Sequence, residues 1–238
     1  MGINTDLAFT LLMLIKLTSL AECELCFAVA NHSGFLCSAC YQELSKTSAA
    51  CLFCAEPLKT MGVCHRCLLK PPPTDSVFCS YLYLPPLSLW IKAFKDKQQL
   101  GQLPRLLWLM KNNAPELEHI DAVAYIPSEG LKLLKRGFNP AELIARQLAA
   151  TYNLPVLGKA LSKKTAQDQR LLSRPERIKN SQKSIHAGKL NLTNKSILLI
   201  EDVVTTGATA NAAALALKQQ GATYVQVWAL ARTPNYSQ

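Results

Sequence analysis

Blocks of apolar residues recur along the second part of the chain, separated by polar segments. Five short apolar runs are expected to form strands, at about residues 77–84, 121–127, 155–161, 195–202 and 224–232. Helical spacing of apolar residues predicts helices near 86–95, 99–112, 139–151 and 208–221, whereas the stretch 128–138 is expected to be a loop. Strands that alternate with helices predict an α/β fold, in which helices cover both faces of a mostly parallel sheet.

Local signals mark the ends of two of these helices. Asn139 is a good N-terminal cap, and Pro140 suits the first helical position because its missing N–H would have no partner there. Gly221 is a good residue to close the helix that begins near residue 208. These signals predict where the two helices begin or end.

The first 20 residues contain an apolar segment, Leu7 to Leu20, that has features of an export signal. Against export, the first six residues include no Lys or Arg, and Asp6 stands where a positive charge is expected. Lys16 also interrupts a run that is already too short to cross a bilayer. We therefore expect a buried or docking helix in a cytoplasmic protein without stable membrane insertion, with membrane association through this segment as the alternative.

Composition divides the remaining chain in two. Cysteines are concentrated between residues 21 and 70, and a proline-rich stretch, "KPPPTD", follows them. We expect an N-terminal apolar helix over 1–20, a cysteine-rich domain over 21–70, a linker over 71–76 and an α/β domain over 77–238.

Eight of the nine cysteines form four CxxC pairs, separated by ten, ten and nine residues. The pairs are Cys23 with Cys26, Cys37 with Cys40, Cys51 with Cys54, and Cys64 with Cys67. Each CxxC turn directs two thiolates to one point, and two turns complete a tetrahedral zinc site. The spacing predicts two structural zinc ions, whose ligation would supply folding free energy to a segment with few core residues. Cys79, in an apolar run, is expected to be a buried core residue.

The pairing of the four CxxC turns has two alternatives. Sequential pairing joins the first turn to the second and the third to the fourth, whereas interleaved pairing leaves 24 and 23 residues between partners. We favour sequential pairing. Iron–sulfur binding is less favoured, because these spacings match neither ferredoxin pattern, and redox disulfides are the least favoured alternative.

The strand expected at 195–202 ends in two adjacent acids within the sequence "ILLIEDVVTTGATA". Ligands of open parallel sheets collect at the carboxyl ends of the strands, where Glu201 and Asp202 are expected. The small and hydroxylated residues Thr205–Thr209 lead into a helix, whose N-terminal N–H groups can bind a phosphate. The pattern therefore predicts a sugar phosphate: the acids accept hydrogen bonds from a vicinal diol, and the loop binds the phosphate.

Two rival interpretations of this motif are weaker. An acid-ended strand also occurs in nucleotide hydrolases, but the chain has no GxxxxGK(S/T) phosphate loop and no GxGxxG dinucleotide fingerprint. The acids could also be purely structural, as caps between a strand and a helix.

Positive charge is concentrated in the second part of the chain. The chain carries a formal net charge of +10, and residues 159–195 hold 10 Lys or Arg against Asp168 and Glu176. Such a surplus favours a polyanionic partner or a phosphorylated ligand. The alternative is a solvated basic loop without a dedicated ligand.

These motifs together resemble a known family. "ILLIEDVVTTGATA" is similar to the phosphoribosyl-pyrophosphate signature of type I phosphoribosyltransferases. With the CxxC pairs, "KRGFN" at 135–139 and the stretch 169–180, the chain resembles the ComF family of competence proteins and its GntX-like relative, from about Cys23 to Arg232.

The resemblance implies a type I phosphoribosyltransferase-like sheet preceded by a zinc-binding domain. It makes Glu201 and Asp202 the catalytic acids that contact the ribose hydroxyls, and it places Arg136 near pyrophosphate, with Mg²⁺ carried by the ligand. The other implied contacts to phosphoribosyl pyrophosphate are Val203, Val204, Thr205, Thr206, Gly207, Ala208 and Thr209. Residues 163–180 take the position of the flap that closes over the site in active transferases.

Three functions are compatible with this resemblance. The first is a ComF-type accessory factor that handles single-stranded DNA in natural transformation and works with a helicase-like partner. Its DNA contacts would be Lys163, Lys164, Arg170, Arg174 and Arg177. The second is an active phosphoribosyltransferase on an unidentified base or amine, and the third is a non-catalytic sensor of phosphoribosyl pyrophosphate. The chain shows no readable base-recognition hood, which favours binding over catalysis.

Overall fold

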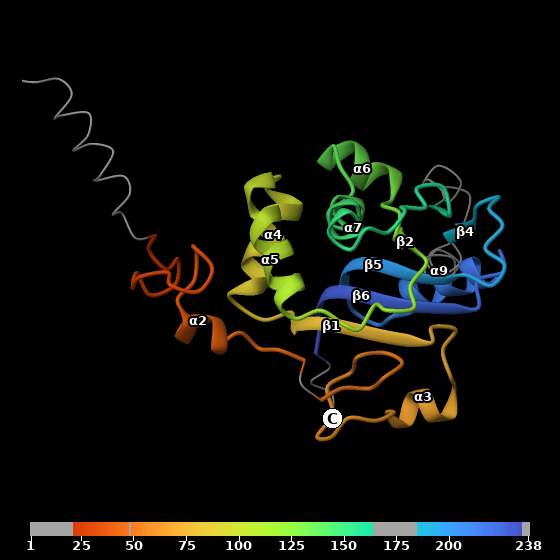
Figure 1. The fold of residues 1–238 in the computed structure, drawn as a ribbon, viewed down its shortest axis with the longest axis horizontal. Helices are drawn as coiled ribbons and strands as arrows, with labels where there is room; N and C mark the ends of the chain where they lie inside the picture. Colours follow the sequence, from red (N-terminus) through yellow and green to blue (C-terminus); the bar gives the residue numbers. More distant parts are fainter. Residues whose placement is uncertain (1–20, 48, 164–184, 235–238) are drawn as a thin grey trace, which may run out of the picture. The chain divides into compact units, whose positions relative to one another are not determined.

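The computed structural model describes residues 21–47, 49–163 and 185–234. The chain divides into two compact units, one ending at Ser45 and the other beginning at Lys46 (Figure 1). The cysteine-rich segment is shared between them, because the first four metal-type cysteines precede this boundary and the other four follow it. The expected helix at 1–20 lies outside the described residues.

The second unit is built on a four-stranded sheet in the order β1-β6-β5-β2. Its strands are β1 (Ser76–Leu82), β2 (Ala122–Tyr125), β5 (Ser196–Val204) and β6 (Tyr224–Arg232). Every neighbouring pair is parallel, so all four strands end at the same edge. The near-continuous apolar sequences of β5 and β6 are typical of strands buried on both faces. The predicted α/β fold with a parallel sheet is confirmed.

Helices cover the two faces of this sheet. The main ones are α4 (Leu87–Asp96), α5 (Leu103–Asn112), α7 (Pro140–Thr151) and α9 (Ala208–Lys218). Leu217 of α9 packs in one core cluster with Val227 of β6. The next residue, Trp228, contacts the ring of Tyr152, the C-terminal cap residue of α7, at a centroid distance of 6.1 Å. Successive strand residues point to opposite faces, so α9 and α7 lie on opposite sides of the sheet. In Figure 1, α4, α5 and α7 lie above it.

The predicted end signals are confirmed in part. The Asn139 side chain accepts a hydrogen bond from the N–H of Ala141 at 3.1 Å, and Pro140 is the first residue of α7. Gly221 has a positive φ of 102°, but α9 already ends at Lys218.

Two predicted elements are wrong. The stretch 128–138 is not a loop throughout, because it contains α6 (Gly130–Arg136), which ends at Gly137 in the left-handed conformation. Its leucines and lysines are strong helix formers, and the Gly137 N–H bonds the Leu133 carbonyl at 2.7 Å. Residues 155–160 do not form a strand: Val156 makes a single bridge to Val123, and a strand begins only at Leu161.

A short antiparallel pair lies beside the sheet instead. It consists of β3 (Leu161–Lys163) and β4 (Ile185–Ala187), with Lys163 opposite Ile185. The segment between them, 164–184, is outside the described residues.

The cysteine-rich parts contain little regular structure. The first unit contains α2 (Ser38–Gln42), and the cysteine-rich part of the second unit contains α3 (His65–Leu69). Outside the cysteine-rich parts, a short 3-10 helix, η1 (Leu100–Gln102), lies between α4 and α5. The turn containing Cys51 and Cys54 attaches to the edge of the sheet, since the Val77 N–H of β1 bonds the Leu52 carbonyl at 2.8 Å. Among the described helices, none has the length and apolar character needed to span a membrane.

Candidate functional site

The two acids of the motif lie inside β5, not at its end. The strand was expected to stop at Asp202, but its pairing with β6 continues to Val204, which lies opposite Arg232. The loop therefore begins at Thr205, and α9 begins three residues later. This arrangement still places both acids at the carboxyl edge of the sheet.

Glu201 is a buried acid whose side-chain oxygen Oε2 has no hydrogen-bond partner among the described residues. Burial, followed by repulsion from Asp202, raises its pKa to about 8, although the charges of Lys95, Lys163 and Arg232 oppose this. Burial of an unpaired carboxylate is unfavourable, so this carboxyl group is largely protonated at neutral pH. A ligand that donates hydrogen bonds would relieve the cost.

Asp202 is held differently from its neighbour. Its Oδ2 lies 2.6 Å from the Nζ of Lys95, in the last turn of α4, and both side chains are about four-fifths buried. Its Oδ1 accepts a hydrogen bond from the N–H of Val203 at 2.8 Å. One acid of the pair is therefore held by a cationic partner and oriented, while Oε2 of the other has no hydrogen-bond partner among the described residues. The two acids can therefore bind a ligand in different ways: Asp202 through a carboxylate already held by Lys95, and Glu201 through a buried oxygen that can bond a ligand.

The loop after β5 is open on the side where a phosphate would bind. Thr205 and Thr206 are exposed, and Gly207 has φ 78°, with no atom within 4 Å of the position that a Cβ would occupy. The hydroxyl of Thr206 accepts a hydrogen bond from the N–H of Ala208 at 3.3 Å, so one N–H of the first turn is already engaged. Gly207 supplies no side-chain cap to α9. The N-terminus of this 11-residue helix therefore retains N–H groups and a partial positive charge for an anion.

Arg136 does not contact the acid pair directly. It is the last residue of α6, and its Nη2 lies 3.1 Å from Oδ1 of Asp96. Asp96 follows Lys95 on α4, so two adjacent residues of this helix hold Asp202 and Arg136. Lys95 and Asp96 were missed by the sequence analysis, because charged residues in the last turn of a helix are ordinary.

The predicted DNA contacts fall mostly outside the described part of the chain. Lys163 is described, and its Nζ lies 3.2 Å from Oε1 of Glu129, the residue that precedes α6. The other four, Lys164, Arg170, Arg174 and Arg177, lie in the segment 164–184.

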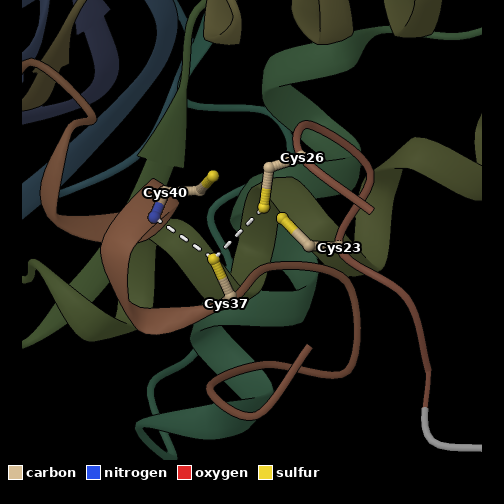
Figure 2. Close-up of side chains that lie close together, drawn as sticks. All are labelled: Cys23, Cys26, Cys37 and Cys40. Atoms are coloured by element: carbon tan, nitrogen blue, oxygen red, sulfur yellow. Dashed lines mark hydrogen bonds between the residues drawn. The ribbon is translucent and has the colours of Figure 1, made fainter. Parts of the chain in front are cut away.

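The first cysteine cluster consists of Cys23, Cys26, Cys37 and Cys40, whose sulfur atoms all lie within 4.8 Å of one another. Figure 2 shows these four side chains close together, with Cys37 contacting the sulfur of Cys26 at 3.6 Å and the backbone N–H of Cys40 at 3.4 Å. Burial favours the neutral Cys23 thiol, but backbone hydrogen bonds from Cys37, Leu25 and Cys26 lower its pKa to about 6. The cluster thus offers a thiolate near neutral pH, which is the form that binds metal.

The second cluster has the same composition and lies in the unit that contains the sheet. Its members are Cys51, Cys54, Cys64 and Cys67, again within 4.8 Å of one another. Burial opposes ionisation of Cys51, but hydrogen bonds from the backbone of Cys64 and Phe53 help to lower its pKa to about 7. Four cysteine sulfurs that converge on one point can supply all four ligands of a tetrahedral zinc ion, which is typical of a structural zinc site. The two clusters confirm sequential pairing of the CxxC turns.

Cys79, the ninth cysteine, is a buried residue of β1, as predicted. Burial raises the pKa of its thiol, which makes this cysteine a core residue and a poor nucleophile.

Similarity to known proteins agrees with this architecture. Residues 133–237 match the phosphoribosyl transferase domain family. Competence protein F of Haemophilus influenzae is 30% identical over 207 residues, which cover 83% of this chain and 90% of that protein. DNA utilization protein YhgH of Escherichia coli O157:H7 is 31% identical over 211 residues, covering 85% and 92%. YhgH of Salmonella typhimurium is 30% identical over the same coverage.

Solved structures add a weaker likeness. The purine phosphoribosyltransferase from Pyrococcus horikoshii is 16% identical, with a TM-score of 0.31 over 57% of this chain and 84% of that one. The assignment therefore depends on the sequence relatives. Because they match at about 30% identity over nine-tenths of their length, this chain belongs to the ComF family, the family of Competence protein F and YhgH.

Proposed function

We propose that this protein is an accessory factor of DNA utilization or natural transformation that binds phosphoribosyl pyrophosphate and handles single-stranded DNA. One observation carries the ligand part of the proposal. A buried carboxyl oxygen of Glu201, without a partner among the described residues, precedes a loop that opens onto the N-terminus of α9. Hydrogen-bond donors at one end of the ligand and a phosphate at the other would satisfy both features.

The ligand would engage the two acids in different ways. Asp202 is oriented by its ion pair with Lys95 and can accept a hydrogen bond from one ribose hydroxyl, while Oε2 of Glu201 can accept one from the other. Thr205, Thr206 and the N–H groups at the start of α9 would hold the 5′-phosphate. Arg136 would reach pyrophosphate after exchanging Asp96 for the ligand, and Mg²⁺ would arrive with the ligand's own phosphates.

Calorimetric titration with phosphoribosyl pyrophosphate and Mg²⁺ tests this assignment. The wild type should bind, and the Glu201→Gln, Asp202→Asn double variant should lose most of the affinity, because Asp202→Asn removes the charged acceptor paired with Lys95 and Glu201→Gln puts an amide N–H₂ donor beside the ribose hydroxyls. Glu118→Gln is a matched control, since Glu118 is exposed and lies before β2, away from the motif. Wild type without detectable binding, or a double variant with unchanged affinity, would contradict the assignment.

Binding is separated from catalysis by a screen for pyrophosphate release. If no base or amine releases pyrophosphate while the sugar phosphate still binds, the protein is an accessory factor or a sensor. Release that depends on a defined acceptor and disappears in Asp202→Asn would instead make it an active phosphoribosyltransferase.

The DNA part of the proposal is supported by charge and by the names of the relatives. Competence protein F and DNA utilization protein YhgH are named for functions that involve DNA. Residues 159–195 carry the basic surplus of the chain, and backbone phosphates of single strands bind such surfaces with strong salt dependence.

Single-strand affinity should therefore fall steeply between about 50 mM and about 200 mM salt. Reversal of Lys163, Lys164, Arg170 and Arg174 to Glu should abolish binding. A control with the same change in net charge reverses the exposed Lys59, Lys92, Lys97 and Lys111, and should retain much more affinity. Equal losses in both variants would show a non-specific charge effect and would remove residues 159–195 as the DNA-binding surface.

A further inference from the structure

A buried ion pair joins the second cysteine cluster to the end of the central sheet. The Nη2 atom of Arg232 lies 2.5 Å from Oε2 of Glu56, and the two residues are only 2% and 7% exposed. Removing one member of such a pair would leave the other charge buried and uncompensated. The pair therefore fixes the relative position of the two segments that carry it.

On the sheet side, the pair supports the residue that precedes the phosphate loop. Arg232 ends β6, and its Nη1 donates to the carbonyls of Thr233 at 3.0 Å and Val204 at 3.4 Å. The N–H of Thr233 donates to the same Val204 carbonyl at 2.9 Å. Val204 ends β5, so these bonds hold the point from which the loop departs.

On the cysteine side, Glu56 is placed by the cluster itself. Its carbonyl accepts the N–H of Cys51 at 2.8 Å. Its own N–H donates to the sulfur of Cys54. The carbonyl of Glu56 thus bonds Cys51 and its N–H bonds Cys54. The geometry of the cluster therefore sets the position of the Glu56 carboxylate.

A second path reaches the other flank of the loop. The buried hydroxyl of Thr74 lies 3.1 Å from the carbonyl of Phe53 and 3.4 Å from Oδ1 of Asn211. Phe53 lies between Cys51 and Cys54, and the N–H of Asn211 bonds the carbonyl of Gly207 at 2.9 Å. The same CxxC turn therefore contacts the residue before the loop through Arg232 and the first turn of α9 through Thr74.

We propose that Glu56, Arg232 and Thr74 are positioning residues that couple metal occupancy of the second cysteine cluster to the geometry of the phosphate loop. This inference rests on the proposed sugar-phosphate site. A bound zinc ion would fix Cys51 and Cys54, and through them Val204 and Asn211. Coupling between two sites is reciprocal, so the sugar phosphate should in turn hold the metal more tightly.

The first test uses the zinc-loaded full chain and calorimetry with phosphoribosyl pyrophosphate. Thr74→Val keeps the shape of the side chain but removes the hydroxyl, and Glu56→Gln removes the charge. Each substitution should weaken the affinity for phosphoribosyl pyrophosphate about fivefold or more. This is the lower end of the range typical of coupling between two binding sites. Thr47→Val is the control, because Thr47 precedes the cluster and contributes to neither path.

The second test measures metal directly, by the rate of zinc transfer to a colorimetric chelator. Cys26→Ser should leave zinc only in the second cluster, and Cys54→Ser only in the first. Phosphoribosyl pyrophosphate should slow zinc release at least about fivefold from Cys26→Ser and leave release from Cys54→Ser unchanged. Thr74→Val in the Cys26→Ser background should reduce the protection.

The outcomes separate this inference from the proposed function. If the wild type does not bind phosphoribosyl pyrophosphate, the proposed site is wrong. If it binds, but Thr74→Val and Glu56→Gln bind equally well and the ligand does not slow zinc release, the site stands and the coupling is refuted. Amide exchange over 224–232 shows whether Glu56→Gln is folded, and if that variant unfolds, Thr74→Val and the zinc measurement decide.

Discussion

At the carboxyl edge of the sheet, Glu201 combines burial with the absence of a hydrogen-bond partner for Oε2 among the described residues. Both conditions favour the neutral acid, and the negative charge of Asp202 adds to them. A carboxyl group of this kind is costly to the fold when it ionises. Such a cost is typical of residues that are kept for binding or catalysis and not for stability.

The pKa of Glu201 predicts a specific pH dependence of stability. Folding raises this pKa from its ordinary value of 4.5 to about 8, so the folded state binds the proton more tightly. The stabilisation is complete below the unfolded pKa and is lost as the pH rises through about 8. Between about pH 6 and about pH 8 the loss should amount to roughly 2 kcal/mol.

Denaturant unfolding of wild type and Glu201→Gln at the two pH values measures this loss. The variant should lack this part of the pH dependence and should be the more stable protein at the higher pH. Other titrating groups cancel in the difference between the two proteins. A difference that does not change with pH would mean that Glu201 titrates normally.

At the scale of elements, the sequence predicted the bounds best where a long apolar run or a helix-capping residue marked the element. The last strand, Tyr224–Arg232, has the bounds that its apolar run predicted, and α7 begins at Pro140 as its cap and proline indicated. Residues 130–136 were read as a loop because α6 is short, and its leucines are largely exposed, so no buried face marked it.

Gly221 shows how one backbone position limits the connection between α9 and β6. Its φ is 102°, and a Cβ there would lie 2.9 Å from the backbone nitrogen of Thr193. Gly221→Ala should therefore destabilise the protein by roughly 1–3 kcal/mol, from the strained φ and the contact together.

Gly101→Ala is the matched control in a denaturant unfolding experiment. Gly101 lies in η1, its φ is not positive, and no atom lies within 4 Å of the Cβ position. This substitution should change the free energy of unfolding by less than about 1 kcal/mol. Similar losses at both positions would show that the contact with Thr193 is relieved by a small shift.

At the scale of the whole molecule, the two cysteine clusters belong to different compact units. We expect two zinc ions per chain by elemental analysis, with one lost in Cys26→Ser and one in Cys54→Ser. Because the second cluster shares a unit with the sheet, Cys54→Ser should also lower the unfolding temperature of the sheet. Cys26→Ser should leave amide protection in β5 and β6 unchanged, and a loss of protection there would contradict this independence.

The sequence predicted the components of the candidate site better than their connections. The acid pair, the threonine-rich loop and the eight cysteines were identified from local spacing alone. Lys95, Asp96 and the Glu56–Arg232 pair were not, because these contacts join residues from 40 to 176 positions apart. Nothing in the local sequence distinguishes such residues from ordinary surface charges.

The ladder between β3 and β4 has a practical consequence for protein engineering. Lys163 and Ile185 are direct antiparallel partners, so the two residues that flank the segment 164–184 are held beside each other by the ladder. A two-residue Asn-Gly turn has the right length to join such partners. We therefore expect that the whole segment can be exchanged as a cassette, for a minimal turn or for the equivalent stretch of a relative, while β3 and β4 keep their register.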